Sequence, residues 1–260
     1  VIGTPYMGLF HSLSAGNRIF ITPWRHLIDK GGPLIDMGVH FTDLIRYQLG
    51  DITEVYGDAR LIEPVRVKQQ SIGDTYEFYQ QRHKAMDDEV PATAEDTSMA
   101  IFKMASGATV SWIVNVGGHG GGGNQQILGA QGCIEGFGSR GSSTRLKVAG
   151  REDVEYEQLL AEHADMALEP LAEYFFPQRS SVGDAAVDWK IIALEQYELA
   201  EAILNGRELE VDGEEGLKDV AAVYAICESA RAGRTVTMQE VESAAVYAYQ
   251  AEIDTALGIG

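Results

Sequence analysis

The chain has 260 residues, of which 45% are hydrophobic and 23% charged, a composition typical of a folded protein with a substantial core. Its 39 acidic and 20 basic residues leave a formal net charge of -19. Because such a surface repels phosphate backbones and anionic lipids, the composition argues against nucleic-acid and membrane-surface binding. No apolar run approaches the roughly 18 residues that a transmembrane helix needs.

The two cysteines, Cys133 and Cys227, stand far apart and outside any C-x-x-C spacing. This pattern favours two reduced, packed thiols over a disulfide framework or a zinc site. The chain also does not open on a basic stretch followed by an apolar one, the mark of a secretory signal. We therefore expect a cytoplasmic protein.

The first predicted elements are a strand over residues 6–12 and a turn over residues 14–18. In the connecting segment 19–30, Trp24 and Arg25 stand out. Two interpretations of these side chains stay open. They either pack and pair with surface carboxylates, or they contact a sugar, since aromatic faces and guanidinium forks are common in polyol pockets.

Residues 31–49 predict a helix. Two glycines precede Pro33, which suits the first helical turn, and apolar residues then recur at helical spacing up to Gly50. Asp36 and His40 lie one turn apart on this helix and therefore share a face. A carboxylate beside an imidazole can fix its tautomer, as a proton-transfer group requires, although a surface pair is the commoner role of this spacing.

After this helix, residues 52–62 alternate as a strand does, and the segment 63–97 is long, polar and weakly periodic. A loop of this length inside a compact domain is uncommon unless it has a role of its own. A lid, an interface and a disordered surface segment all remain open for it.

Residues 98–105 and 108–116 predict a hairpin, because the two-residue link Ser106-Gly107 joins two alternating strands. Asn115 and His119 lie at the end of the second strand. They could reach a substrate pocket, although a satisfied polar group at a strand end is the commoner role for each.

The glycine-rich stretch 117–123 has no predicted helix behind it to receive a pyrophosphate, so we expect a loop and no dinucleotide fingerprint there. Residues 125–134 and 144–148 predict two further strands. The strands together predict an α+β fold, with an open, mainly antiparallel sheet of about six strands and helices packed on one face.

The remaining sequence predicts helices. Two of them begin with a capping-box pattern, Asp212 with Glu215 and Thr237 with Glu240. The tail from Thr237 predicts one last helix, for which we expect a role in a subunit contact. The predicted helices are residues 156–167, a further turn of helix from Pro170, residues 184–204, residues 214–232 and the tail 237–260.

Several residues at fixed offsets resemble the signature of the Gfo/Idh/MocA family, whose members are nicotinamide-dependent sugar and polyol oxidoreductases. They are Trp24-Arg25, Gly31-Gly32, Leu34, Asp36, Gly38, His40 and Asp43. A second stretch is similar to the closing element of the same family, and its residues are Asp212-Gly213-Glu214-Glu215-Gly216, Ala225-Ile226, Glu228-Ser229 and Gly233-Arg234-Thr235-Val236.

The resemblance implies that Asp36 and His40 occupy the family's two catalytic positions. His40 would take the proton from a substrate hydroxyl, Asp36 would orient His40, and NAD or NADP would accept the hydride. The implied partners are a small sugar, polyol or glycoside substrate and further copies of the chain, paired through the open sheet face. The expected substrate contacts are Trp24, Arg25, Asn17, Asn115 and His119.

Members of the family also carry an N-terminal Rossmann domain and a Glu-Lys-Pro motif with a catalytic lysine, and neither occurs in this sequence. We therefore expect a C-terminal domain (residues 1–236) with a helical tail, without the NAD(P)-binding domain and catalytically incomplete by itself. A non-catalytic sugar-binding or oligomerisation domain is the open alternative. A metal enzyme using Asp36 and His40 is disfavoured, because no H-x-x-x-H or H-E-x-x-H spacing joins them.

Overall fold

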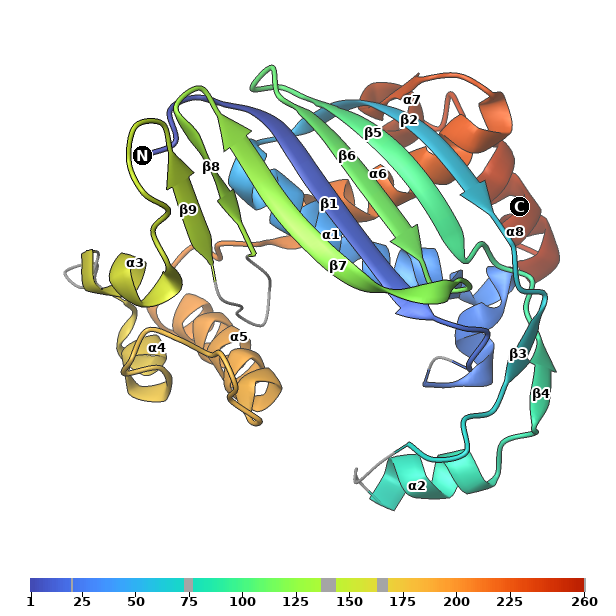
Figure 1. Cartoon of the computed structure of the whole chain (residues 1–260). Coiled ribbons are helices and arrows are strands. Elements are labelled where there is room, and N and C mark those ends of the chain that lie inside the picture. The colour runs from blue at the N-terminus through green and yellow to red at the C-terminus, as the bar shows by residue number, and fades with distance from the viewer. Residues whose placement is uncertain (20, 73–76, 137–143, 163–167, 260) are drawn as a thin grey trace. The chain divides into compact units, whose positions relative to one another are not determined.

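A computed structural model describes residues 1–19, 21–72, 77–136, 144–162 and 168–259 of the chain (Figure 1). The fold is α+β, as predicted, but the main sheet has eight strands and not about six. Their order across the sheet is β10-β2-β5-β6-β1-β7-β8-β9. The strands are β1 (Pro5–Ala15), β2 (Ile52–Arg60), β5 (Thr97–Met104), β6 (Thr109–Asn115), β7 (His119–Gly129), β8 (Gly132–Glu135), β9 (Arg145–Val148) and β10 (Val236–Thr237).

Two predictions about the strands were wrong. The single strand predicted over residues 125–134 is a hairpin of β7 and β8, and β7 begins within the glycine-rich stretch that was predicted as a loop. Glycines carry no side chain whose alternation could reveal a strand. Glycines also let neighbouring strands approach closely. On β8, for example, a Cβ on Gly132 would lie 2.1 Å from the backbone oxygen of Lys147 on β9.

The chain forms two compact units. The larger unit comprises Leu9–Asn124 and Gly216–Gly260, and the smaller unit comprises Val1–Gly8 and Gln125–Glu215. The smaller unit holds β8 and β9 with three helices, namely α3 (Tyr156–Glu162), α4 (Pro170–Phe175) and α5 (Val187–Asn205). The helix predicted over residues 184–204 is thus confirmed, and the end of the one predicted over residues 156–167 lies outside the described residues.

In the larger unit, α1 (Gly32–Leu49) and α6 (Gly213–Ala232) cover one face of the strands (Figure 1). The ring of Trp112 on β6 stacks on Phe41 of α1 with 5.6 Å between centroids and lies 6.2 Å from Phe102 of β5. Buried residues alternate along β6 as its sequence predicts. The larger unit therefore has a half-covered sheet with its core beneath the two helices.

Two glycines of the signature permit this packing. A Cβ on Gly38 would lie 3.0 Å from Val223 of α6 and 3.2 Å from Trp112. Gly32 has a φ of +68°, and a Cβ there would lie 2.3 Å from Cβ of Ala94. Gly32 therefore requires glycine, whereas a side chain at Gly38 would force its neighbours to shift by a few tenths of an ångström.

Residues 63–97, whose role the sequence left open, contain regular structure. β3 (Val65–Val67) pairs with β4 (Glu89–Pro91), and α2 (Glu77–Lys84) lies between them in the chain. Arg66 and Asp96 form a buried ion pair of 2.7 Å at the base of this segment. Asp96 also accepts hydrogen bonds from the backbone nitrogens of Ile62 and Glu63. This network ties both ends of the segment to the core.

The C-terminal tail belongs to the larger unit and forms two helices where one was predicted, α7 (Met238–Glu242) and α8 (Ala248–Leu257). The capping box of Thr237 and Glu240 is confirmed at the start of α7. Buried Glu228 of α6 accepts hydrogen bonds from the first backbone nitrogens of α8, at Tyr249 and Gln250. This contact attaches α8 to α6. Among the described residues, none of the helices is long and apolar enough to cross a membrane.

Candidate functional site

The candidate site is built from a short 3-10 helix, η1 (Pro23–His26), and the first turns of α1. Arg25 of η1 donates a hydrogen bond to the carboxylate of Asp36 and forms an ion pair with it. The two side chains are 22% and 25% exposed, so the pair lies at the surface and its water-facing side is accessible. The structure thereby brings together two residues that the signature places eleven positions apart.

The loop between the two elements is held in place by backbone hydrogen bonds. The carbonyl of His26 accepts from the backbone nitrogens of Thr93 and Ala94, at 2.8 and 3.1 Å. The backbone nitrogen of Ile28 in the next 3-10 helix, η2 (Ile28–Lys30), donates to the Thr93 hydroxyl. Gly31 and Gly32 then turn the chain into α1 with positive φ angles. This turn sets Arg25 against Asp36.

His26, the residue after Arg25, is a buried histidine that the sequence reasoning missed. Its side chain is 1% exposed. Burial, followed by the positive charge of Arg66, lowers the pKa of His26 to about 4. His26 is therefore neutral near pH 7 and serves the fold of the loop, whereas the site's accessible histidine is His40.

His40 is exposed on α1, one turn after Asp36. The carboxylate of Asp36 is bonded to Arg25, and no hydrogen bond between the described residues joins Asp36 to His40. The orientation of His40 by Asp36 therefore stays a prediction. Arg25, expected as a substrate contact, is also the residue that positions Asp36.

The other three predicted contacts lie around the ends of β1 and β6. The side-chain oxygen of Asn115 accepts hydrogen bonds from the backbone nitrogens of Gly117 and Gly118, the strand-end role that was the alternative for it. The His119 side chain is 72% exposed, with Nε2 3.3 Å from Oε1 of Glu63. The backbone carbonyl of Asn17 accepts from the backbone nitrogen of Val67. Substrate contact by these three residues stays a prediction.

A cleft of about 470 Å³ extends from Trp24. The guanidinium of Arg25 lies 5.4 Å from the Trp24 ring, so the cleft adjoins the Arg25–Asp36 pair. Its far wall comes from α2, in the segment for which the sequence left a lid, an interface and a disordered surface segment open. The lining residues are Thr22, Pro23, Trp24, Phe78, Gln81, Arg82, Ala85 and Met86.

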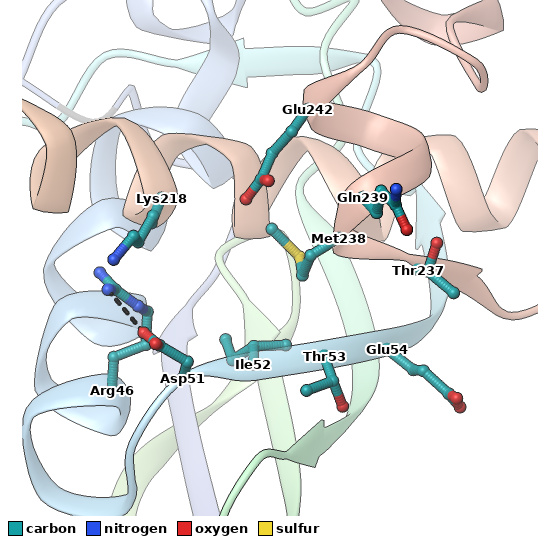
Figure 2. A pocket seen from close by; sticks show the side chains of 10 residues that line it. All are labelled: Arg46, Asp51, Ile52, Thr53, Glu54, Lys218, Thr237, Met238, Gln239 and Glu242. Carbon is teal, nitrogen blue, oxygen red and sulfur yellow. Dashed lines mark hydrogen bonds and ion pairs between the residues drawn. The ribbon is translucent and has the colours of Figure 1, made fainter.

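A second hollow of about 500 Å³ lies between the start of β2, α6 and α7 (Figure 2). Figure 2 shows the ion pair of Arg46 with Asp51 at one end and Glu242 above Met238. Arg46 is also bonded to the buried Asp219 at 2.7 Å. The carboxylates of Asp51 and Asp219 therefore already neutralise Arg46.

The described residues offer no complete metal or dinucleotide site. They contain no group of three or more His, Cys, Asp or Glu side chains that could hold a metal ion. The glycine-rich stretch leads into β7, and no helix follows it to face a pyrophosphate. What the site presents is an exposed imidazole, a fixed ion pair and an accessible indole ring, which suit proton transfer and the binding of hydroxyl groups.

A model of the GFO/IDH/MocA C-terminal domain matches residues 1–135 of the chain. Among curated protein sequences, none matches it. Solved structures with the same fold include an oxidoreductase from Agrobacterium radiobacter in complex with NAD+, L-tartaric acid and magnesium. It is 21% identical over 92% of this chain and 58% of its own, with a TM-score of 0.61.

Two further structures agree with this fold. An NAD-binding oxidoreductase from Klebsiella pneumoniae is 19% identical over 91% of this chain and 60% of its own, with a TM-score of 0.66. A levoglucosan dehydrogenase in complex with NADH is 19% identical over 91% of this chain and 59% of its own, with a TM-score of 0.63. The chain thus spans about three fifths of the length of these proteins.

Proposed function

The chain belongs to the GFO/IDH/MocA C-terminal-domain family, and from this premise we propose that it is the substrate-binding half of an NAD(P)-dependent oxidoreductase. The reaction is hydride transfer at a hydroxyl or carbonyl carbon of a sugar, polyol or glycoside. The observation that carries the proposal is the Arg25–Asp36 ion pair one turn before the exposed His40, within the part of the chain that matches the family.

In the oxidation direction, the imidazole of His40 accepts the proton of the substrate hydroxyl as the carbonyl bond forms. A nicotinamide, when bound, supplies the acceptor for the hydride that leaves the same carbon. Asp36, which Arg25 holds one turn before His40, orients the imidazole for this transfer. Arg25 and the ring of Trp24 contact substrate hydroxyls and C–H faces.

The nicotinamide is held mainly by a separate N-terminal domain, which also contributes the family's lysine. Support comes from the structural neighbours, which are longer than this chain and were solved with NAD+ or NADH. Levoglucosan and L-sorbose in other structures of the dehydrogenase support a polyhydroxylated substrate. By itself, this chain binds substrate without turning it over.

A homo-oligomer paired through the uncovered sheet face completes the proposal. On β2 and β5 of the larger unit, Tyr56, Met99 and Ile101 are 51%, 53% and 45% exposed. Tyr56 and Ile101 are directly paired across the two strands. An apolar row of this kind on an open sheet favours contact with another copy.

The test uses the chain joined to its nucleotide-binding domain and the variant His40→Ala. Removing a general base lowers the turnover number by about 10²–10⁴-fold. We expect this loss with a dissociation constant for the nucleotide that stays within threefold, about 0.6 kcal/mol. Steady-state kinetics and nucleotide titration measure the two quantities.

Tyr47→Ala, an exposed change two turns further along α1, is the matched control. It should retain turnover. Equal turnover of His40→Ala and the native protein would refute the role of His40. A native protein that binds sugars and transfers no hydride would instead establish the non-catalytic alternative.

A further inference from the structure

The cleft between η1 and α2, here called the Trp24–Phe78 cleft, has the size and lining of a ligand site. Its volume of about 470 Å³ lies within the range of about 300–1,000 Å³ for small-molecule pockets. Trp24 and Phe78 are 44% and 58% exposed, so two large rings are left uncovered in one hollow. Single exposed apolar residues are common on protein surfaces, whereas two exposed aromatic rings in one hollow indicate a binding site.

An arginine guanidinium lies over each of the two aromatic rings. Arg82 lies 4.7 Å from the Phe78 centroid, and Arg25 lies 5.4 Å from that of Trp24. An aromatic face beside hydrogen-bond donors suits a sugar ring, whose C–H faces stack while its hydroxyl oxygens accept hydrogen bonds. The cleft thus combines both kinds of contact that a pyranose needs.

Arg82 is available for such a ligand. In a chain of net charge -19, no ion pair or hydrogen bond among the described residues engages its guanidinium. A planar guanidinium has five N–H donors, and its stacking on Phe78 leaves these donors free to point into the cleft.

The C-terminal end of the wall formed by α2 is anchored by two contacts. Lys68 donates to the backbone carbonyl of Met86 at 2.8 Å. Nε2 of His83 lies 2.8 Å from the carbonyl of Gln69. These contacts fix the end of the wall that carries Arg82, so a ligand has less of the wall to order when it binds.

From this geometry we infer that the Trp24–Phe78 cleft is an outer subsite for a second sugar ring. The inference rests on the proposed function and narrows its substrate class to glycosides and disaccharides, away from free monosaccharides and inositols. Trp24 is shared between the reacting ring near Arg25 and Asp36 and the outer ring near Phe78 and Arg82.

Binding to the 260-residue chain tests this inference without turnover. Cellobiose, maltose and lactose are compared with glucose and galactose by saturation-transfer NMR and titration. We expect at least one disaccharide to bind about tenfold more tightly than its monosaccharides. Phe78→Ala and Arg82→Ala should each remove most of that difference. Tyr174→Ala changes another exposed aromatic residue, on α4 and outside the cleft, and is the control.

Three results would overturn the inference. They are equal affinity for disaccharides and monosaccharides, loss of the preference in Tyr174→Ala as well, and an effect of Phe78→Ala on self-association without an effect on sugar binding. A disaccharide preference that depends on Phe78, in a full-length protein that transfers no hydride, would leave the subsite standing and refute the proposed oxidoreductase.

Discussion

Helices α5 and α6 are almost equally long, with 19 and 20 residues, yet they differ in burial. In α6, Val223 and Ile226 are fully buried, among nine buried residues. None of the described α5 side chains is buried, and Trp189 and Ile203 are 59% and 74% exposed. Helical spacing predicted both elements. Burial depends on whether another surface packs against the apolar side, which spacing does not tell.

Two ion pairs, one from each unit, differ in the same way. In the larger unit, Arg66 and Asp96 are 1% and 0% exposed. In the smaller unit, Arg207 and Glu169 pair at 2.8 Å with exposures of 43% and 56%. When an exposed ion pair loses one partner, water solvates the remaining charge at little cost. When a buried pair loses one partner, no water reaches the remaining charge. Substitutions at these two pairs should therefore have unequal effects.

The largest effect is expected for Asp96→Ala. The change leaves the Arg66 guanidinium buried without its carboxylate and two backbone N–H groups without an acceptor. Breaking a buried pair in this way lowers the free energy of unfolding by about 3–5 kcal/mol. Urea unfolding followed by circular dichroism measures it. Glu169→Ala, the exposed counterpart, should leave the transition unchanged, and similar losses in both variants would contradict the comparison.

A core substitution should have the next largest effect. Ile226→Ala removes a fully buried side chain of α6 and should lower the free energy of unfolding by about 2–5 kcal/mol, through lost burial and a cavity. Ile203→Ala on α5 should stay within about 0.5 kcal/mol. Denaturant melts of both variants provide the comparison. A large loss for Ile203→Ala would contradict the comparison, because it would show that the exposed face of α5 is covered in the folded protein.

The smallest effect follows from the buried His26. Its pKa is lowered from 6.5 to about 4, so between these values the unfolded chain binds more protons than the folded chain. Stability is therefore lost as the pH falls from 6.5 towards 4, by about 2 kcal/mol at pH 5. His26→Gln should flatten this part of the dependence in unfolding curves measured from pH 7 to 5. An unchanged slope would show that His26 does not titrate in this range.

Local signals allowed much of the fold to be predicted from sequence. The helical spacing after Gly31 and Gly32, the hairpin at Ser106-Gly107 and the capping box at Thr237 each depend on residues a few positions apart. The family signature likewise lies within one short stretch, so the Asp36 and His40 candidates needed no tertiary information. The sequence by itself thus determined the fold class, most helices and the family.

Only the tertiary structure showed which residues from distant parts of the chain contact one another. Arg25 binds Asp36 from another element, Arg66 meets Asp96 thirty residues away, and α2 places Phe78 beside Trp24. The number of strands could also be counted only from their hydrogen-bonded pairing. The start of β7 consists largely of glycines and β10 has only two residues, so neither shows an alternating pattern in the sequence. Such contacts leave no periodic trace in the sequence, since their energy arises only when distant segments exclude water from one another.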